Sequence, residues 1–446
     1  VAADPEVATV TGFLATRSPD FVADGGDATY LAVALDTTDD KEEQEAADGV
    51  RELLADEPGV SVGGPALAQK QVNEQVEEDL RKAEMLAFPL LFLLSFVFFR
   101  SLVASALPLL VGGLAILGTF FALSIAAEIG SISIFALNLT TGLGLGLAID
   151  YSLFMVSRYR EEIAKSGPGL AAMKRTMATA GRTVLFSSLT VAAALASLLV
   201  FPQRFLYSMG LGGSIVALLA AAISLIVLPA VLALLGERVN ALAPKFLQRR
   251  AERETQPLQS GFWYRLSRFV QRRPGRVAVT SAAFLIALGI PFFSIKFTYP
   301  DAQILPEEKS ARQVDDVIRA DFPPNRDTPI RVVAEGNVSP REQLRLAGDL
   351  KTTDGIVQVN PVTQFSEGIT VFEAVAADPY ISDEARETVR RVQEIEAPPG
   401  TTLLVTGATA EFLDFQQSLE EHLPIAVAII VIATLVVLFL MTGSVV

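Results

Sequence analysis

Asp150 is the residue of this sequence whose type and position could most directly do chemistry, because it is the acidic side chain inside a long apolar segment. An ionised carboxylate in the hydrocarbon region of a bilayer costs about 2.5–3.5 kcal/mol on insertion scales, so it must be paired, protonated or hydrated. Arg158 marks the polar end of the segment, and a helical rise of about 1.5 Å per residue places Asp150 about 12 Å inside it. A carboxyl group at that depth, whose ionisation responds to neighbouring charges and hydroxyls, is suited to carry protons.

The residues around Asp150 suggest how it is held. Gly142, Gly146 and Asp150 are spaced by four residues, which places them on one helix face in a pattern of small residues that favours close helix packing. We therefore expect this face to form a helix-packing seam, with Asp150 turned toward protein and not toward lipid. Tyr151 adjoins the carboxylate. A permanently neutral Asp150 that joins helices is the structural alternative, and the residues leave it open.

Several kinds of chemistry are excluded by composition. The sequence has no cysteine and one histidine, so we expect no metal site, no cofactor and no cysteine nucleophile. An intramembrane aspartyl protease needs two buried aspartates, and a Walker-type nucleotide loop is absent. The net charge of −14 argues against a nucleic-acid partner. We predict no catalytic residues and no enzyme activity.

The elements that must position Asp150 are membrane spans. The 446 residues are 51% hydrophobic and 19% charged, with a mean hydropathy of +0.42, which is typical of a membrane protein with soluble domains. The expected spans are 85–99, 103–127, 131–157, 183–202, 205–235, 277–295 and 423–443.

The distribution of charge predicts the orientation of these spans. Basic residues gather in the loops 158–182 and 237–276, which should be cytoplasmic. Acidic residues outnumber basic ones at least two to one in 1–84 and 297–422, which should be large domains on the outer side. Alternation through seven spans satisfies all four assignments.

These boundaries predict six regions. Residues 261–276 mix aromatic and arginine side chains, which indicates an interfacial helix or a solvated basic linker. The regions are external domain 1 (1–84), a five-span bundle (85–236), a cytoplasmic basic linker with an interfacial helix (237–276), a span (277–296), external domain 2 (297–422) and a last span (423–446).

Hydrophobic periodicity predicts α+β folds for the external domains. The expected strands of the second domain are 329–335, 356–362, 369–377 and 401–405, and the expected helices are 341–351 and 383–396. Their order is βαββαβ, as in ferredoxin-like folds. For the first domain we expect strand 28–36, helix 41–55, strand 59–62 and helix 66–84.

The two external domains and their following spans are copies of one another. Residues 32–36 align with 374–378 at an offset of 342, and an offset of 343 then aligns Gly64 with Gly407 and continues into the spans. Such a repeat is a common way to build a transporter with a site between its halves. We expect both copies to be incomplete in this sequence.

The segment from Gly142 to Glu162, GLGLGLAIDYSLFMVSRYREE, resembles the fourth-span signature of MMPL-type transporters, a branch of the resistance-nodulation-division (RND) superfamily. The resemblance extends over essentially the whole chain. Further similar stretches are 181–187, 201–203, 261–263 and 305–312.

The resemblance implies an RND-type helical bundle with external porter domains, located in the bacterial cytoplasmic membrane. It implies proton-driven export of a lipid or other hydrophobic substrate, with protons and membrane lipids as further partners. Asp150 and Tyr151 match the family's first Asp-Tyr relay pair, which faces a second pair on the tenth span. Ser187 and Phe154 match residues that line the same pocket. By this alignment the seven spans are the second to the eighth of twelve.

The sequence departs from the family pattern in one respect: it stops before the tenth span. We therefore expect either a fragment of a full transporter or a chain that cannot run the cycle unaided. A lipid-sensing or sterol-sensing scaffold of the same superfamily, without proton-coupled transport, is the alternative function. Whether the chain forms a homo-oligomer is left open by the sequence.

Overall fold

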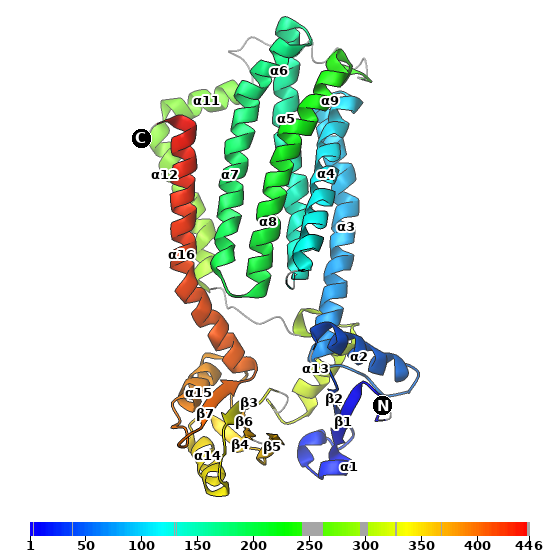
Figure 1. Ribbon diagram of the computed structural model, residues 1–446, viewed down its shortest axis with the longest axis vertical. Coiled ribbons are helices and arrows are strands. Elements are labelled where there is room, and N and C mark those ends of the chain that lie inside the picture. Colours follow the sequence, from blue (N-terminus) through cyan, green and yellow to red (C-terminus); the bar gives the residue numbers. More distant parts are fainter. Residues whose placement is uncertain are drawn as a thin grey trace. The chain divides into compact units, whose positions relative to one another are not determined.

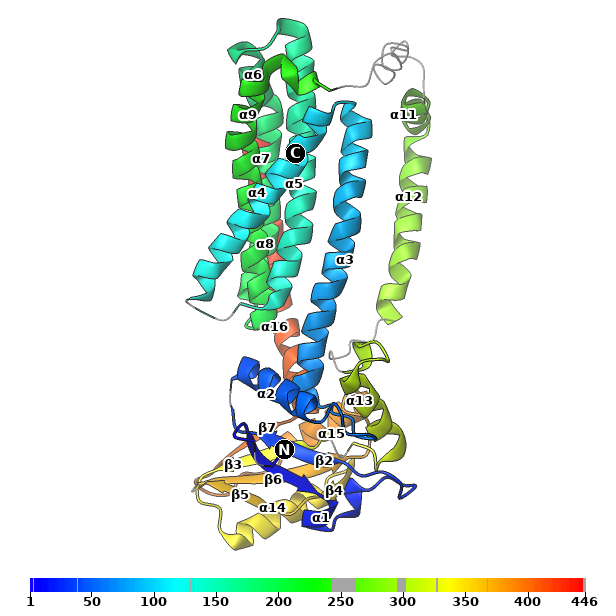
Figure 2. The same cartoon turned by 90° about the vertical axis from the view of Figure 1, so that its right-hand side faces the viewer.

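The computed structural model describes residues 1–2, 4–37, 39–128, 130, 132–242, 262–294, 302–325, 328–366 and 368–443. The chain divides into two compact units: the first contains residues 1–79 and 298–419, and the second contains 80–297 and 420–446. Figures 1 and 2 show small sheets in the first unit and long helices in the second.

The larger sheet of the first unit has the strand order β4-β6-β3-β7, with β5 also paired to β6. All of these pairs are antiparallel. The strands are β3 (Ile330–Glu335), β4 (Ile356–Val359), β5 (Thr363–Ser366), β6 (Ile369–Ala376) and β7 (Thr402–Thr406), and the helices between them are α14 (Pro340–Thr352) and α15 (Asp383–Gln393). The predicted strands and helices of this region are therefore confirmed, and β5 is an additional strand.

Alternation of side chains explains how this sheet builds a core. On β3, Ile330, Val332 and Ala334 are buried while the residues between them face outward or lie half-buried. These three side chains belong to one cluster with Leu346 and Leu350 of α14. The helix begins at a capping box, in which Ser339 and Glu342 satisfy each other's backbone amides.

The N-terminal part of the first unit has a two-stranded sheet, in which β1 (Val7–Gly12) pairs antiparallel with β2 (Leu31–Leu35). The helical elements that follow β1 and β2 are α1 (Phe13–Thr16), η1 (Pro19–Phe21) and α2 (Asp40–Leu53). The predicted strand at 59–62 is wrong, because these residues are irregular. Its repeat counterpart β7 bonds to β3, and no described strand offers an equivalent partner beside 59–62.

Side chains of α3 (Pro65–Phe99) join the pieces of the first unit. Gln71 is buried; its amide nitrogen donates to Ser310 Oγ at 2.9 Å, and its amide oxygen accepts from the backbone of Ala311 at 3.2 Å, at the start of α13 (Ser310–Asp321). Burial of Asp48 on α2 opposes ionisation, but hydrogen bonds from Lys70 and Arg51 outweigh it, so the pKa of Asp48 lies below its ordinary value of 3.8. A short helix, η7 (Ala302–Ile304), precedes α13.

The second unit consists of helices, several of which are continued by short segments of 3-10 or π geometry. They are α4 (Leu102–Ala127), α5 (Ile134–Ser166), α6 (Leu170–Thr176), η2 (Met177–Gly181), α7 (Arg182–Ala196), η3 (Ser197–Val200), α8 (Arg204–Ala222), η4 (Ile223–Val227), α9 (Leu228–Leu235), η5 (Gly236–Asn240), α11 (Phe262–Arg272), α12 (Pro274–Gly289) and η6 (Ile290–Ser294). The last helix, α16 (Ala408–Thr442), begins in the first unit and ends in the second.

Seven helical stretches among the described residues are long and apolar enough to cross a bilayer. They are 65–99, 102–127, 134–166, 170–200, 204–240, 274–292 and 408–442, and each contains most of one predicted span. Residues 243–261 of the predicted basic linker lie outside the described residues.

The repeat is visible in the bounds of the helices. An offset of 343 converts the bounds of α3, 65–99, into those of α16, 408–442. Gly64 and Gly407, immediately before these helices, both have left-handed backbone angles, with φ of 112° and 109°. The same offset relates the first residue of α2 to that of α15.

Candidate functional site

Asp150 lies in the middle of α5, which packs against α4 and α8. Figure 1 shows α5, α7 and α8 running along the same bundle. The helix begins where the side chain of Ser133 accepts a hydrogen bond from the backbone of Phe135. It ends at Gly167, whose φ of 74° breaks the helical path.

One face of α5 is tightly packed. Gly144 is on this face, and a Cβ atom built on it would lie 2.7 Å from Val216 Cγ2 of α8. A Cβ atom built on Gly112 of α4 would lie 3.1 Å from Leu145 Cδ1. Glycine therefore permits the approach of α4 and α8 to α5 at positions where a side chain would collide.

The other face of α5 carries Gly142, Gly146, Asp150 and Phe154, and all four are exposed in the described chain. We call these four residues the open lane. A Cβ atom built on Gly142 or Gly146 would meet no described atom within 4 Å. The expected seam is thus not covered by another described helix. Among Gly142, Gly144 and Gly146, it is Gly144 that contacts a neighbouring helix.

Tyr151 lies on the packed face of α5, seven residues after Gly144. Its ring belongs to the buried cluster of the bundle and is 5% exposed, whereas Ser187, on α7, is exposed. The hydroxyl groups of Tyr151 and Ser187 are close enough to interact. No described group, however, gives the buried Tyr151 hydroxyl a hydrogen bond of good geometry.

The six predicted site residues therefore divide into two groups. Asp150, Gly142, Gly146 and Phe154 lie together on the open lane. Tyr151 and Ser187 lie beside each other, and Tyr151 follows Asp150 directly in the chain. The structure brings the predicted relay residues into one region of the bundle, but it turns the Asp150 side of that region outward.

A buried carboxylate one helical turn beyond Arg158 was missed by sequence reasoning. Glu162 is 2% exposed and is surrounded by three cations. Arg158 Nη2 lies 2.9 Å from Glu162 Oε1, and Lys165 Nζ and Arg175 Nη1 each lie 3.5 Å from a carboxylate oxygen of Glu162. Arg158 and Lys165 at spacings of four and three residues were the available signal, since such pairs share a helix face.

This cluster connects α5 to the segment before α7. Arg158 Nε also donates to Thr179 Oγ1 at 3.1 Å, and Thr179 belongs to the π-helical segment η2. Gly181 of η2 packs against Leu225 of the second π segment, η4: its built Cβ would lie 3.5 Å from Leu225 Cδ2. Both segments contact α5. Such π-helical turns are frequent at functional sites.

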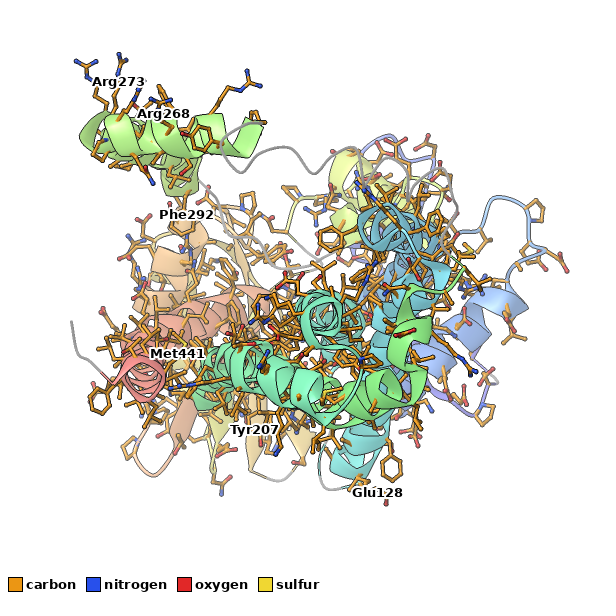
Figure 3. All side chains as sticks on the ribbon, turned by 90° about the horizontal axis from the view of Figure 1, so that it is seen from above. Glu128, Tyr207, Arg268, Arg273, Phe292 and Met441 are labelled. Carbon is orange, nitrogen blue, oxygen red and sulfur yellow. The ribbon has the colours of Figure 1, made fainter. Side chains whose placement is uncertain are left out.

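The helical segment formed by α7 and η3 contacts α16 near both of its ends. At one end, Arg182 Nη2 donates to the backbone oxygen of Met441 at 2.7 Å. At the other end, the rings of Phe201 and His422 are 6.2 Å apart. Figure 3 shows Met441 at the end of α16, beside the bundle. The helix that carries Ser187 is therefore in contact with the helix that continues from the first unit.

Comparison with known proteins identifies the family of this chain. The model of the MMPL family matches residues 2–277 and 369–446. A Streptomyces coelicolor protein, SCO6666, named as a membrane protein, is 37% identical over 96% of this chain and 59% of its own length.

Two mycobacterial relatives have named activities. The trehalose monomycolate exporter MmpL3 of Mycobacterium tuberculosis is 32% identical over 87% of this chain and 45% of its own length. MmpL3 of Mycolicibacterium smegmatis, named for the same export, is 30% identical over 94% of this chain and 45% of its own length. The chain thus spans about half the length of the curated relatives it matches.

Proposed function

This chain belongs to the MMPL family of multi-pass membrane transporters, and we propose that its protein exports lipids or other hydrophobic molecules across the bacterial cytoplasmic membrane by using the proton motive force. In this proposal Asp150 and Tyr151 are half of an intramembrane proton relay. The named activity of the two MmpL3 relatives supports a lipid as the substrate.

The observation that carries the proposal is the exposure of Asp150 on the open lane. An ionised carboxylate facing acyl chains would cost about 2.5–3.5 kcal/mol or more, so protein or water has to cover it in the working transporter. Gly142 and Gly146 leave room for the backbone of a covering helix to approach. A carboxylate at the contact between α5 and a covering helix couples its own ionisation to the packing of the two helices.

The neighbouring hydroxyls complete the proposed relay. Tyr151 has a buried hydroxyl without a well-formed hydrogen bond in the described chain, and it can donate to or accept from a group that arrives beside Asp150. Ser187 lies within reach of that hydroxyl. Phe154 follows Asp150 by one turn and provides an apolar wall that limits water.

Two continuous helices offer a way to transmit movement. α3 and α16 each run without a break from the first unit into the second. α16 contacts α7 through Arg182 and also contacts Phe201, the residue that follows η3, and α7 carries Ser187. In the proposed cycle, protonation of Asp150 from the outer side weakens pairing across the lane, the helices shift, and deprotonation to the cytoplasm resets them.

The domain arrangement follows the same proposal. Regions 1–84 and 297–422 are external porter domains, and the βαββαβ order of the sheet with α14 and α15 supports a ferredoxin-like fold for the second. Region 85–236 is the five-span bundle, and 237–276 is cytoplasmic. The acidity of the external regions and the basic loops support this orientation.

Asp150→Asn tests the relay in the full-length protein reconstituted in vesicles with an imposed pH gradient. Transport of a fluorescent lipid should fall at least about 100-fold, the scale of a lost proton-transfer group. Glu128→Gln, which removes an exposed carboxylate after the end of α4, is the matched control and should transport normally.

Three results would contradict the proposal. Transport by the Asp150→Asn variant at the normal rate would remove Asp150 from the relay. Wild-type transport that persists after the proton gradient is dissipated would remove the driving force. Loss of the variant from the membrane would favour the structural alternative, in which Asp150 only joins helices.

A further inference from the structure

The helix α11 has two chemically different stripes along its length. Phe262, Leu266, Phe269 and Val270 follow helical spacing and form an apolar stripe. Three arginines with spacings of three and four residues form a second stripe along one edge of the first. They are Arg265, Arg268 and Arg272.

The side chains of both stripes are exposed. The side chains of Phe262 and Phe269 are 63% and 53% exposed, and those of Leu266 and Val270 are about two-fifths exposed. Arg268 and Arg272 are also exposed, and neither has an ion pair within the described residues. Figure 3 labels Arg268 on α11 and Arg273, the residue that follows this helix, on the side away from the other helices.

The chain turns sharply between α11 and the apolar helix α12. Arg273 leaves the helical conformation with φ of −138° and ψ of 51°, and Pro274 starts α12. Figures 1 and 2 together show α11 running across the end of α12 instead of continuing it. If α12 crosses the bilayer, α11 lies along the bilayer surface.

Charge identifies the surface that fits α11. Residues 262–276 contain five arginines and no acidic residue. Each basic residue near an anionic membrane surface contributes about 1 kcal/mol of attraction. Arginine stems can also lie along the acyl boundary while their guanidinium groups reach phosphate oxygens. An apolar stripe bordered by arginines matches acyl chains bordered by headgroups.

We propose that α11 is a binding site for anionic phospholipid, in which the apolar stripe enters the acyl boundary and Arg265, Arg268 and Arg272 bind headgroup phosphates. The site fixes the start of α12 at the bilayer surface. It is independent of the open lane on α5 and does not require proton-driven transport.

The sequence contains one tryptophan, Trp263, which is on α11, so tryptophan fluorescence of the chain reports on this helix. The full chain would be placed in nanodiscs of mixed phosphatidylglycerol and phosphatidylcholine, with bromine on the acyl chains of one lipid at a time. Brominated phosphatidylglycerol should quench Trp263 fluorescence at least about threefold more than brominated phosphatidylcholine, and 0.5 M salt, at a Debye length of about 4 Å, should reduce the difference.

Variants separate the arginine stripe from charge in general. R265Q/R268Q/R272Q should make the two brominated lipids equally effective, whereas R265K/R268K/R272K should keep most of the preference. The control R341Q/R345Q/R390Q makes the same charge change at exposed arginines of the first unit and should behave as wild type.

Equal quenching by both lipids in the wild-type chain would overturn the proposal. A preference retained by the triple glutamine variant would also overturn it. Absence of quenching by either lipid would place α11 away from the bilayer and favour an acidic protein partner instead.

Discussion

The two faces of α5 both carry glycine, but glycine has a different role on each face. Toward α8, Gly144 is in contact with Val216, and a Cβ atom there would collide. On the open lane, Gly142 and Gly146 have no described neighbour within the range of a Cβ atom, and Asp150 follows them on the same face. The packed face holds the bundle together, and the open lane presents an ionisable group.

Helical geometry explains why glycines two residues apart lie on opposite faces of α5. Two residues advance the helix by about 200°, so Gly144 points opposite to Gly142, and Gly146 returns to within about 40° of Gly142. A Gly-x-Gly-x-Gly segment therefore supplies glycine to both faces at once. The contrast teaches that glycine spacing alone cannot assign a helix-packing seam.

The largest expected effect is at Gly144. Gly144→Leu should destabilise the bundle by about 3 kcal/mol, because the new side chain overlaps Val216 in a packed interior. Thermal unfolding of the purified chain in detergent, followed by circular dichroism of its helices, measures the change. Equal melting of Gly144→Leu and wild type would show that the packed face is not packed as described.

A smaller effect, on a different property, is expected at Gly146. Gly146→Leu should leave the melting temperature unchanged, because its side chain enters open space. In the full-length protein it should slow lipid transport at least about tenfold, since it obstructs close helix approach at the lane. Gly113→Leu is the matched control, because a Cβ on that α4 glycine also meets no described atom within 4 Å. Normal transport by Gly146→Leu would contradict the different roles assigned to the packed face and the open lane of α5.

The smallest effect is expected at Tyr151, which is on the packed face and follows Asp150 in the chain. Tyr151→Phe removes a buried hydroxyl that lacks a well-formed hydrogen bond in the described chain, so stability should change by less than about 0.5 kcal/mol. Transport should fall about fivefold, the equivalent of one neutral hydrogen bond of about 1 kcal/mol. A large loss of stability with unchanged transport would make Tyr151 a packing residue only.

Much of the fold followed from charge and periodicity. The absence of charges over long segments predicted all seven apolar helices, because a bilayer tolerates few ionised side chains. The alternation on β3 and the glycine before each long helix predicted the second sheet and the repeat. Gly64 and Gly407 were informative because left-handed backbone angles favour glycine.

Other features depend on contacts that a sequence does not display. The strand predicted at 59–62 failed because pairing, and not propensity, decides whether an extended segment joins a sheet. The π segments η2 and η4 have no distinctive composition. Glu162 sits among ordinary charged neighbours, and its burial among three cations arises from the fold of α6 against α5.

The most direct test of the central claim is infrared difference spectroscopy of the full-length protein in lipid. We predict a carboxylic acid band that is absent from Asp150→Asn and that changes in intensity when a proton gradient drives transport. The band should also respond to bound lipid substrate. An Asp150 carboxyl band that changes neither with the gradient nor with substrate would contradict its role as a proton carrier.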